Sequence, residues 1–496
     1  MLRKIRIVLA ALFFISIVWL FVDFTGLAQQ WFGWMAKIQF LPAVLALNIG
    51  VVVGILALTL AFGRIYCSVI CPLGVMQDIF AWFGKKAKKN RYHYSAAKTW
   101  LRWIVLAVFV VLLIVGLGSL AALIAPYSAF GRICQTLLQP LWLWGNNLFA
   151  LVAEKSNSYA FWHEDVWVRS WPVMVVVIVT LVALAVLAWR NGRTYCNTIC
   201  PVGTVLGFVS RFSFIKPVIN TDKCNNCGLC ARNCKAACIN PKEHKIDYSR
   251  CVDCMDCLGK CRQGAISLRT SLPKKAPSSV IDNADTVVDK SKRTFITTSA
   301  VLVGTAALKA QEMKVDGGLA EIADKKIPRR HTKIVPSGSV SINNLETHCT
   351  GCQLCVSECP NGVLRPSGGL MNFMQPEMSF ERGYCRPECT RCGDVCPTGA
   401  IRPITIEQKT AIQVGHAVYV RHNCVAAHTE DECGLCARHC PTGAIQMVPL
   451  RHKGRDVLVP AVNEERCIGC GKCEHLCPAR PFPAIYVEGH EVHKEI

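Results

Sequence analysis

Two runs of four cysteines in residues 224–261 decide how this sequence is interpreted. They read Cys224-Asn-Asn-Cys227-Gly-Leu-Cys230-Ala-Arg-Asn-Cys234 and Cys251-Val-Asp-Cys254-Met-Asp-Cys257-Leu-Gly-Lys-Cys261. Disulfide scaffolds are typically short and have varied cysteine spacings, whereas cysteines this close together converge on one metal ion or cluster. Thiolates are soft ligands that suit iron–sulfur clusters, and zinc knuckles do not usually repeat four cysteines at this pitch. The two runs therefore predict two cubane iron–sulfur clusters.

The ligands of these two clusters follow from the way two-cluster ferredoxins are built. In such proteins the fourth cysteine of each run ligates the cluster of the other run. We therefore assign one cluster to Cys224, Cys227, Cys230 and Cys261, and the other to Cys251, Cys254, Cys257 and Cys234. The fourth cysteine usually precedes a proline, but Lys235 and Arg262 follow here. This departure removes no ligand.

Four further cysteine runs lie near the C-terminus, in residues 346–496. Each run ends in Cys-Pro, and the two middle runs have a stretched first spacing, as is common in multi-cluster electron carriers. Their 16 cysteines predict four more [4Fe-4S] clusters, which makes about six in the chain. Spacing alone does not assign the crossing ligands. The runs are Cys349, Cys352, Cys355 and Cys359; Cys385, Cys389, Cys392 and Cys396; Cys424, Cys433, Cys436 and Cys440; and Cys467, Cys470, Cys473 and Cys477.

Six of the 30 cysteines lie outside these runs. Four of them form a repeated C-x3-C-P motif, in which each copy follows an Arg-x-Tyr: Cys67 with Cys71, and Cys196 with Cys200. The repeat predicts two equivalent helix ends that are brought together. Their thiols would hold an extra metal centre, form redox-active disulfides, or pack inertly. Cys134 and Cys238 are expected to be small buried side chains without a further role.

Apolar stretches and charged loops predict a membrane protein. Stretches at roughly 5–22, 39–62, 104–125 and 172–189 span or nearly span a bilayer core of about 30 Å. The 63–102 loop holds eight Lys or Arg against one acid, so the positive-inside bias places it in the cytoplasm, with the N-terminus and the segment after residue 190. The formal net charge of +21 fits this bias, and the absence of a nucleic-acid-reading motif argues against nucleic acid as a partner.

These features predict an α-helical membrane domain, with four spans and a candidate fifth, joined to α+β ferredoxin-like iron–sulfur domains. Residues 295–310 are apolar but short, and are expected to form either the fifth span or an export signal. The expected units are the membrane domain at 1–215, a two-cluster ferredoxin module at 216–270, a polar linker at 271–294, the span or signal at 295–310, and a four-cluster domain at 346–496.

The motifs resemble a pair of families from periplasmic nitrate reductase systems. Residues 1–270 resemble the NapH family of membrane quinol dehydrogenase components, which share the C-x3-C-P motifs and the two-cluster module. Residues 291–496 resemble the NapG and MauM families, including the run Cys467-Ile-Gly-Cys470-Gly-Lys-Cys473-Glu-His-Leu-Cys477. This resemblance implies nested pairing of the C-terminal runs, first with fourth and second with third. It also implies twin-arginine export, although Lys292 stands in place of the first arginine.

The resemblance also implies a function. It indicates a multi-pass protein of the inner (cytoplasmic) membrane, with the first module cytoplasmic and the C-terminal domain periplasmic. Electrons would pass from the quinol pool through the clusters to an extracytoplasmic cytochrome or reductase, and His163, Glu164 and Asp165 are candidate proton acceptors. The alternative function is a redox assembly or maintenance factor for a partner metalloenzyme, as relatives that share C-x3-C-P suggest. A cluster-based sensor would need an output module, and the sequence shows none.

Overall fold

Two long apolar sequences without internal glycine form the longest helices, α1 (Leu2–Val22) and α12 (Trp171–Asn191). Pro172 is tolerated because it lies in the first turn of α12, where its missing N–H would have no partner. The computed structural model describes residues 2–87, 92–158, 161–270, 323–428, 432–452 and 455–496. Within these residues, α1 and α12 are the two helices that are long and apolar enough to cross a membrane.

The expectation of four long spans is wrong, because two of the predicted stretches are broken. The 39–62 stretch forms α4 (Phe40–Leu45) and α5 (Ile49–Phe62), separated by Leu47 in the left-handed region and by Asn48, which caps α5. The 104–125 stretch forms α8 (Thr99–Ile114) and α9 (Gly118–Ile124), separated by Gly116 at φ 84°. The candidate fifth span at 295–310 and the linker at 271–294 lie outside the described residues.

Shorter helices complete the bundle, and two sets of them are built alike. After α5 and after α12, a Gly-Arg turn leads into a five-residue helix that carries the first cysteine of each C-x3-C-P motif. The Cys-Pro pair then begins the next helix, with proline in its first turn. These and the other helices of the bundle are α2 (Leu27–Phe32), α3 (Trp34–Lys37), α6 (Ile65–Val69), α7 (Pro72–Lys86), α10 (Pro126–Ile133), the π-helix η1 (Cys134–Leu138), α11 (Gln139–Lys155), α13 (Thr194–Thr198), α14 (Pro201–Val209) and the 3-10 helix η2 (Ser210–Phe212).

The first ferredoxin module is a small α+β unit. Strands β1 (Ile215–Ile219) and β4 (Ile266–Thr270) pair antiparallel, with Ile219 opposite Ile266. Strands β2 (Ile239–Asn240) and β3 (Lys245–Ile246) form a second antiparallel pair, and α15 (Leu229–Arg232) lies within the first cysteine run. The two pairs hold the cysteine loops between them, as a ferredoxin-like fold requires.

The C-terminal domain has three antiparallel strand pairs. These are β5 (Leu364–Pro366) with β6 (Pro376–Met378), β7 (Ile412–Tyr419) with β10 (Ile485–Glu495), and β8 (Ile445–His452) with β9 (Arg455–Val462). Its helices are η3 (Ser337–Ser339), α16 (Ile342–His348), α17 (Leu354–Ser357), α18 (Arg391–Asp394), α19 (Ile406–Ala411), η4 (Arg421–Asn423), α20 (Val425–His428), α21 (Leu435–Arg438), η5 (Glu464–Arg466) and α22 (Lys472–Leu476). One apolar core runs from the bundle into the start of this domain, and a second core lies in its more C-terminal part.

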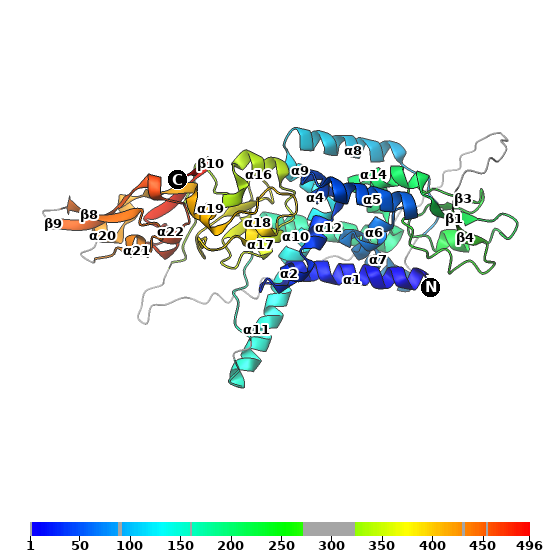
Figure 1. Cartoon of the computed structure of the whole chain (residues 1–496). Coiled ribbons are helices and arrows are strands. Elements are labelled where there is room, and N and C mark those ends of the chain that lie inside the picture. The colour runs from blue at the N-terminus through cyan, green and yellow to red at the C-terminus, as the bar shows by residue number, and fades with distance from the viewer. Residues whose placement is uncertain (1, 88–91, 159–160, 271–322, 429–431, 453–454) are drawn as a thin grey trace, which may run out of the picture.

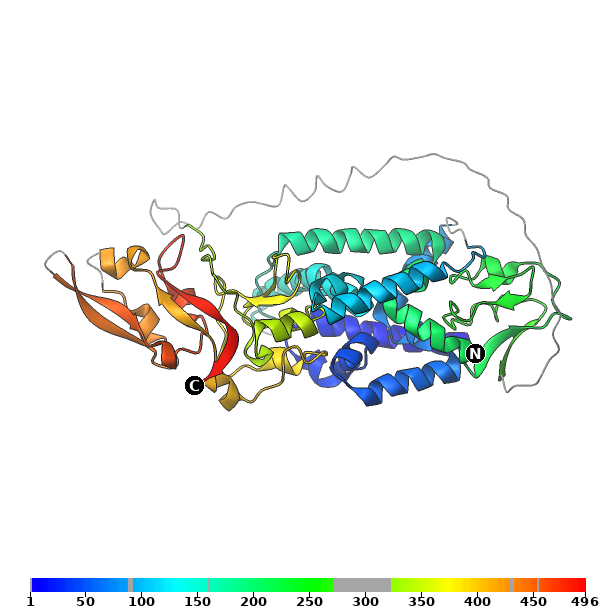
Figure 2. The ribbon, with the colours of Figure 1, turned by 90° about the horizontal axis from the view of Figure 1, so that it is seen from above.

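The two iron–sulfur units lie at opposite ends of the helical bundle. In Figures 1 and 2 the first module and the N-terminus are at one end, and the C-terminal domain is at the other. Arg3 on α1 pairs with Asp256 of the first module at 2.7 Å. At the far end, Gln139 donates to the carbonyl of Ser357 at 3.1 Å and Ser119 donates to that of Met371 at 3.0 Å. The bundle therefore separates eight of the predicted ligand cysteines from the other sixteen.

Candidate iron–sulfur centres

In the first module, the structure brings together the ligand set predicted from the crossing rule. Cys251, Cys254 and Cys257 line one small cavity together with Cys234 from the other run. Cys238, for which we expected no role, lines the same cavity, and its sulfur lies 3.6 Å from that of Cys234. It occupies the position four residues after the crossing ligand.

The first run of this module is closer to the surface. Burial, together with the nearby thiolates of Cys224 and Cys227, raises the pKa of the Cys230 thiol, so these three cysteines lie near one another. Cys227 is exposed. Cys261 accepts a hydrogen bond at its sulfur from the backbone N–H of Ala265 at 3.3 Å. Backbone N–H donors to sulfur are among the features that tune cluster potentials, so this contact suits a cluster ligand.

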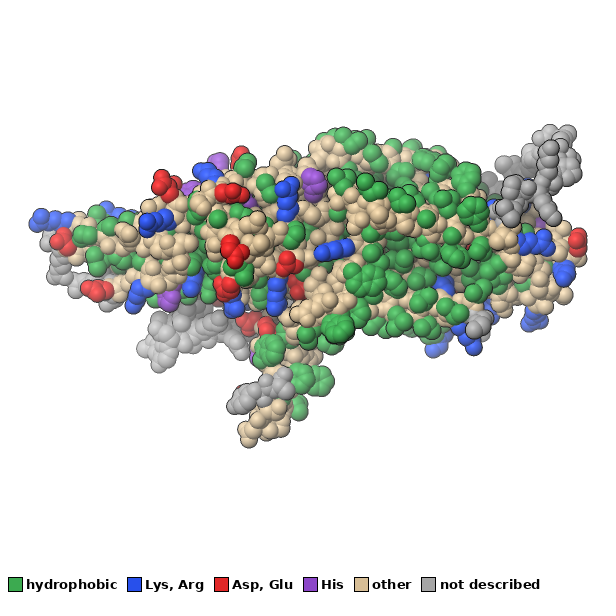
Figure 3. All heavy atoms as spheres, viewed as in Figure 1, with side chains coloured by type: hydrophobic (Ala, Val, Ile, Leu, Met, Phe, Trp, Pro, Cys, Tyr) green, Lys and Arg blue, Asp and Glu red, His purple; other side chains and the backbone are tan. Residues whose placement is uncertain are grey.

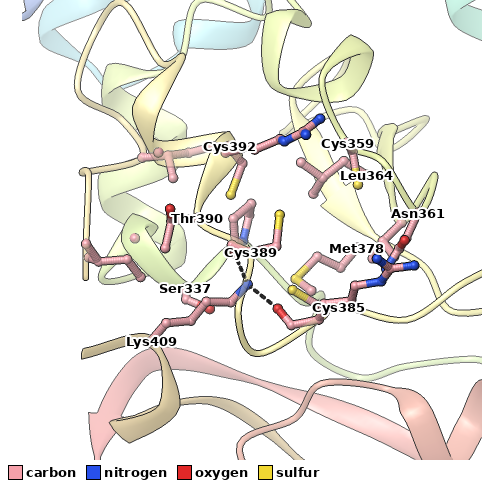
Figure 4. A pocket seen from close by; sticks show the side chains of 18 of the residues that line it. Ser337, Cys359, Asn361, Leu364, Met378, Cys385, Cys389, Thr390, Cys392 and Lys409 are labelled. Atoms are coloured by element: carbon pink, nitrogen blue, oxygen red, sulfur yellow. Dashed lines mark hydrogen bonds between the residues drawn. The ribbon is translucent and has the colours of Figure 1, made fainter. Parts of the chain in front are cut away.

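A second small cavity lies in the C-terminal domain. It is lined by Cys385, Cys389 and Cys392 of the second run and by Cys359, the last cysteine of the first run, and their sulfurs face a common space (Figure 4). The buried Lys409 lies beside them and donates hydrogen bonds to the carbonyl oxygens of Arg386 and Cys389.

Cys396, the last cysteine of the second run, lies with the first three cysteines of the first run. Burial raises the pKa of Cys352 to about 12, and the nearby thiolate of Cys396 acts in the same direction. Cys396 acts likewise on Cys349 and Cys355, whose pKa values are also raised, mainly by burial. The first and second runs therefore exchange their fourth cysteines with each other.

The third and fourth runs are paired in the same way. Burial raises the pKa of Cys436 to about 11, and the thiolates of Cys433, Cys477 and Cys424 add to the shift. For Cys470, burial raises the pKa to about 12, and Cys440 is among the neighbouring thiolates that contribute. The expected nested pairing, first with fourth and second with third, is therefore wrong. The reason is local packing: α17 contacts α18, and α21 contacts α22, so runs adjacent in sequence fold together.

A backbone hydrogen bond connects the two pairs of C-terminal centres. The N–H of Cys385 donates to the carbonyl oxygen of Cys470 at 2.9 Å. Cys385 belongs to the pair formed by the first and second runs, and Cys470 belongs to the pair formed by the third and fourth. The predicted centre of Cys385, Cys389, Cys392 and Cys359 therefore lies directly against that of Cys467, Cys470, Cys473 and Cys440. The four centres therefore form a continuous series.

The two C-x3-C-P motifs meet inside the bundle. Their four cysteines, Cys67, Cys71, Cys196 and Cys200, are 4–5% exposed. They are electrostatic neighbours of one another, because Cys196, Cys71 and Cys67 all act on Cys200. We call these residues the four-thiol centre. All 30 cysteines of the chain are free thiols, so the motifs do not form disulfides in this structure.

Two arginines connect the two motifs of the four-thiol centre, because each donates a hydrogen bond to the other motif. Arg64, which precedes the first motif, donates to the carbonyl oxygen of Cys196 at 3.2 Å, and Arg193 donates to that of Cys67 at 2.6 Å. Arg64 also approaches the sulfur of Cys67 at 3.8 Å, and Gln77 donates to the sulfur of Cys196 at 3.2 Å. The sequence marks both arginines by the repeated Arg-x-Tyr, but their crossing was not predicted.

Arg64 also connects this centre to the first module. Its backbone N–H donates to Asp253 at 2.9 Å, and its guanidinium donates to the carbonyl of Ser249 at 3.1 Å. Asp253 lies between the cluster ligands Cys251 and Cys254. One buried residue therefore contacts the ligand loop of a predicted ferredoxin centre through its backbone and the four-thiol centre through its side chain.

On the side of the four-thiol centre away from the first module, α10 lies between this centre and the C-terminal domain. Tyr127 is buried with Tyr66 and Cys352 among its neighbours, and Tyr66 immediately precedes Cys67. A Cβ atom at Gly131 would approach the carbonyl oxygen of Cys352 to 2.4 Å, so helix and ligand loop are in direct contact there. Arg132 donates to the carbonyl of Gly351 at 3.4 Å. The order of the centres along the molecule therefore follows its long axis.

The role of the three predicted proton acceptors stays a prediction. His163, Glu164 and Asp165 lie in the loop between α11 and α12. The carboxylate of Glu164 accepts a hydrogen bond from the indole of Trp162 at 2.7 Å, and its backbone exchanges hydrogen bonds with Asn147. We find no contact of Glu164 with any of the thiol centres in the described interactions.

The spacing of the described cysteines fits clusters better than single metal ions. Among the described residues, no three His, Cys, Asp or Glu side chains are close enough to hold one metal ion. A cubane cluster keeps its four thiolates further apart than a single ion does, so cysteines that surround a cavity fit a cluster better. The groups around Cys234 and Cys359 have this form.

Comparison with known proteins agrees with this chemistry. A family model described as a 4Fe-4S dicluster domain matches residues 346–426 and again 431–480. The first match contains the first two runs and Cys424, and the second contains the rest of the third run and the fourth run. A model described as a 4Fe-4S binding domain matches residues 44–91 and 171–219, which contain the two C-x3-C-P motifs. This chain carries ferredoxin-type 4Fe-4S domains.

Individual relatives extend over parts of the chain. YccM of Escherichia coli (strain K12), whose name assigns it to electron transport, is 26% identical over 243 residues, or 48% of this chain and 59% of YccM. The methylamine utilization ferredoxin-type protein MauN of Paracoccus denitrificans is 28% identical over 37% of this chain and 50% of its own length. The ferredoxin-type protein NapF of Escherichia coli is 29% identical over 36% of this chain and all of NapF.

The chain thus spans only about half of the length of YccM and MauN. No solved structure matches it. Taken together, the cysteine geometry and the family models establish ferredoxin-type 4Fe-4S domains, and the names of these relatives describe electron transport or ferredoxin-type proteins.

Proposed function

We propose that this protein carries electrons across a membrane, from the quinol pool to an extracytoplasmic cytochrome or reductase. The observation that carries this proposal is the linear order of the thiol centres. The module with two predicted centres lies at one end of an apolar helical bundle, and the domain with four predicted centres lies at the other (Figures 1 and 2). The four-thiol centre is buried in the bundle. Such an order suits one-electron transfer in short steps along the molecule.

The surface of the bundle supports its placement in a membrane. Apolar side chains cover the middle of the molecule in Figure 3, whereas most charged side chains lie towards its two ends. Large exposed apolar residues occur along α1, α5, α8 and α12, including Leu12, Val53, Val111 and Val179, which are each more than half exposed. A continuous apolar surface of this kind indicates contact with lipid.

The distribution of lysine residues supports an orientation with the first module in the cytoplasm. Lys85, Lys86 and Lys260 lie at the end that carries the first module, where Lys85 contacts Asn233 of that module at 2.6 Å. Under the positive-inside bias, this end is cytoplasmic. The C-terminal domain is then on the extracytoplasmic side, as the resemblance implies.

The four-thiol centre is proposed to hold a seventh metal centre. In the described residues the guanidinium of Arg64 is fully buried and donates to no carboxylate: its acceptors are Asn197, the carbonyls of Ser249 and Cys196, and the Cys67 sulfur. A buried cation needs a nearby negative charge. Asp253 lies beside Arg64 on the side of the first module. On the side of the cysteines, thiolates on iron would supply negative charge, since soft thiolate ligands suit iron–sulfur chemistry. The centre would close the gap between the two groups of clusters.

The alternative function, a redox assembly factor that exchanges electrons through its C-x3-C-P thiols, is less well supported. Those four thiols are 4–5% exposed and surrounded by helices, so a partner protein does not reach them directly. Electron transfer through them to neighbouring centres requires no such access.

The proposal is tested with the full-length protein in sealed proteoliposomes. A membrane-soluble quinol should reduce the clusters, and an electron acceptor protein added outside should reoxidise them. Vesicles in which the quinol reduces no cluster, although dithionite reduces all of them in detergent, would contradict the quinol role. Reduction that depends on the orientation of the protein in the vesicle would establish the crossing.

A further inference from the structure

A large cavity lies between α1 and α7, on the side of the bundle that faces the first module. Its volume is about 520 Å³, within the range of roughly 300–1,000 Å³ that is usual for small-molecule sites. Residues from three parts of the chain line it, and they divide into an apolar wall and a charged end. The inference below rests on the proposed function and identifies where its substrate would bind.

The apolar wall faces outward. It contains Phe14 and Ile15 of α1 and Ile79, Trp82 and Phe83 of α7. Ile15 and Trp82 are 63% and 57% exposed, so the cavity is open at the apolar surface of the bundle rather than enclosed in its core. A lipid-soluble molecule would enter there from the membrane.

The charged end lies against the first module. Asp78 accepts from Arg6 at 3.1 Å, from Arg193 at 2.7 Å and from Lys235 at 2.8 Å. Lys235 also lies 3.3 Å from Asp256. Arg6 is 91% buried, and its Nε has no hydrogen-bond partner in the described structure. Arg6 and Lys235 both line the cavity, and cationic donors at the end of an otherwise apolar cavity suit a ligand oxygen.

This end of the cavity adjoins a cluster. Lys235 directly follows the cluster ligand Cys234, and Asp256 lies between the ligands Cys254 and Cys257. A molecule bound against these side chains would be separated from that centre by little more than the ligand loops. The cavity thus combines access from lipid, a polar end and contact with a redox centre.

We propose that this cavity binds the head ring of an isoprenoid quinone, with the ring oxygens towards Arg6 and Lys235 and the tail between α1 and α7. Oxidation of the bound quinol breaks its two O–H bonds. The two protons would leave to water at the charged end. The two electrons would pass one at a time to the cluster that Cys234, Cys251, Cys254 and Cys257 would hold, the first moving on to the neighbouring centre before the second arrives. The quinol is oxidised to the quinone, and two one-electron reductions of the clusters balance it.

Blocking the cavity tests this site. Ala11 lines the cavity and is exposed, so Ala11→Trp would fill the entrance without disturbing the core. Leu12 is the neighbouring residue on α1, is 58% exposed and does not line the cavity, which makes Leu12→Trp the matched control. With decylubiquinol as electron donor, Ala11→Trp should raise the quinol concentration for half-maximal cluster reduction at least tenfold. Leu12→Trp should leave it unchanged, and dithionite should reduce the clusters of both variants fully.

A second measurement does not depend on electron transfer. A photoreactive azidoquinone should label peptides of α1 and α7, and decylubiquinone should prevent the labelling. Equal half-maximal concentrations in the wild type and Ala11→Trp would overturn the site while leaving the proposed function intact. Labelling that is displaced by phosphatidylglycerol but not by decylubiquinone would show an anionic lipid site instead. Failure of decylubiquinol to reduce the wild type would contradict the proposed function itself.

Discussion

Arg64 and Arg193 each donate a hydrogen bond to the carbonyl oxygen of the first cysteine in the other's C-x3-C-P motif, Cys196 and Cys67 respectively. This exchange ties two segments 129 positions apart in sequence into one buried centre with approximate two-fold symmetry. It also explains why arginine stands three positions before each first cysteine. The crossing is the structural basis for regarding the four thiols as one site.

Removing one of these arginines should weaken that site. Arg64→Met leaves the side-chain oxygen of Asn197 without its buried donor and removes one of the two arginine donors to the carbonyl of Ser249. It also removes the positive charge beside Cys67. Breaking a buried charge arrangement typically costs about 3–5 kcal/mol. We expect a lower unfolding midpoint in detergent and loss of metal from the four-thiol centre. Arg211→Met, at an exposed residue of η2, is the control, and equal effects of both substitutions would contradict the role given to Arg64.

The glycines that follow each motif should tolerate no side chain. A Cβ atom at Gly203 would lie 2.3 Å from the carbonyl oxygen of Cys196, and one at Gly74 would lie 2.2 Å from that of Cys67. Gly203→Ala should therefore destabilise the protein by about 1–3 kcal/mol, as overpacking usually does. Gly54→Ala on α5 meets no atom within 4 Å and should be close to neutral. Thermal unfolding of both variants compares them directly; equal midpoints would argue against the close contact.

Iron content tests the pairing of the C-terminal runs. In the structure Cys349 and Cys396 belong to the same centre, so Cys349→Ser with Cys396→Ser should remove one cluster, about four iron atoms. Cys349→Ser with Cys359→Ser removes ligands from two centres and should cost about twice as much iron. Nested pairing would instead place Cys396 and Cys349 in different clusters, so equal iron losses for the two double variants would contradict the observed pairing.

Lys409 should raise the reduction potential of the centre beside it. Its ammonium is buried against the carbonyls of Arg386 and Cys389, next to the thiols of Cys385 and Cys392 (Figure 4). A positive charge stabilises the more negative, reduced cluster, so Lys409→Met should lower that potential by on the order of 100 mV. Lys409→Arg keeps the positive charge and should leave the reduction potential close to that of the wild type. A redox titration followed by EPR measures both, and an unchanged potential in Lys409→Met would refute the effect.

Glu358 should make stability depend on pH. Burial, with a contribution from Asp23, raises the pKa of this carboxyl group from 4.5 to about 7. Because the folded state holds this proton more tightly than the unfolded state, the contribution of Glu358 to stability is greatest below pH 4.5 and falls as pH rises from there to about 7. The loss is at most about 3 kcal/mol. Glu358→Gln should flatten the wild-type decline in denaturant unfolding between pH 5 and 8, and an unaltered slope would exclude Glu358 as its source.

Some of this arrangement follows from the sequence, and some requires the fold. The crossing of Cys234 to the group of Cys251 could be predicted because the two runs are adjacent and evenly spaced. The pairing of the later runs could not, since it depends on which short helices pack together, α17 with α18 and α21 with α22. Likewise, the apolar composition of 39–62 does not distinguish one helix from two, and the break depends on the backbone at Leu47.

Other parts of the site were only weakly indicated by the sequence. Arg64 and Arg193 stood in a repeated motif, but nothing in their spacing indicated that each would reach across to the other cysteine pair. Asp78 was counted only as the single acid of a basic loop, yet it accepts from three cations at the end of the α1–α7 cavity. Long-range contacts of this kind arise from how helices pack, which local patterns do not encode.

The central claim is that the four-thiol centre connects the two groups of clusters. The most direct test uses full-length protein in proteoliposomes, comparing the wild type with a variant that carries Cys67→Ser and Cys196→Ser. EPR of samples frozen after mixing with decylubiquinol would follow each group of clusters separately. We predict that the quinol still reduces the first-module clusters of the variant but no longer reduces those of the C-terminal domain. Equal reduction of the C-terminal clusters in both proteins would contradict the account.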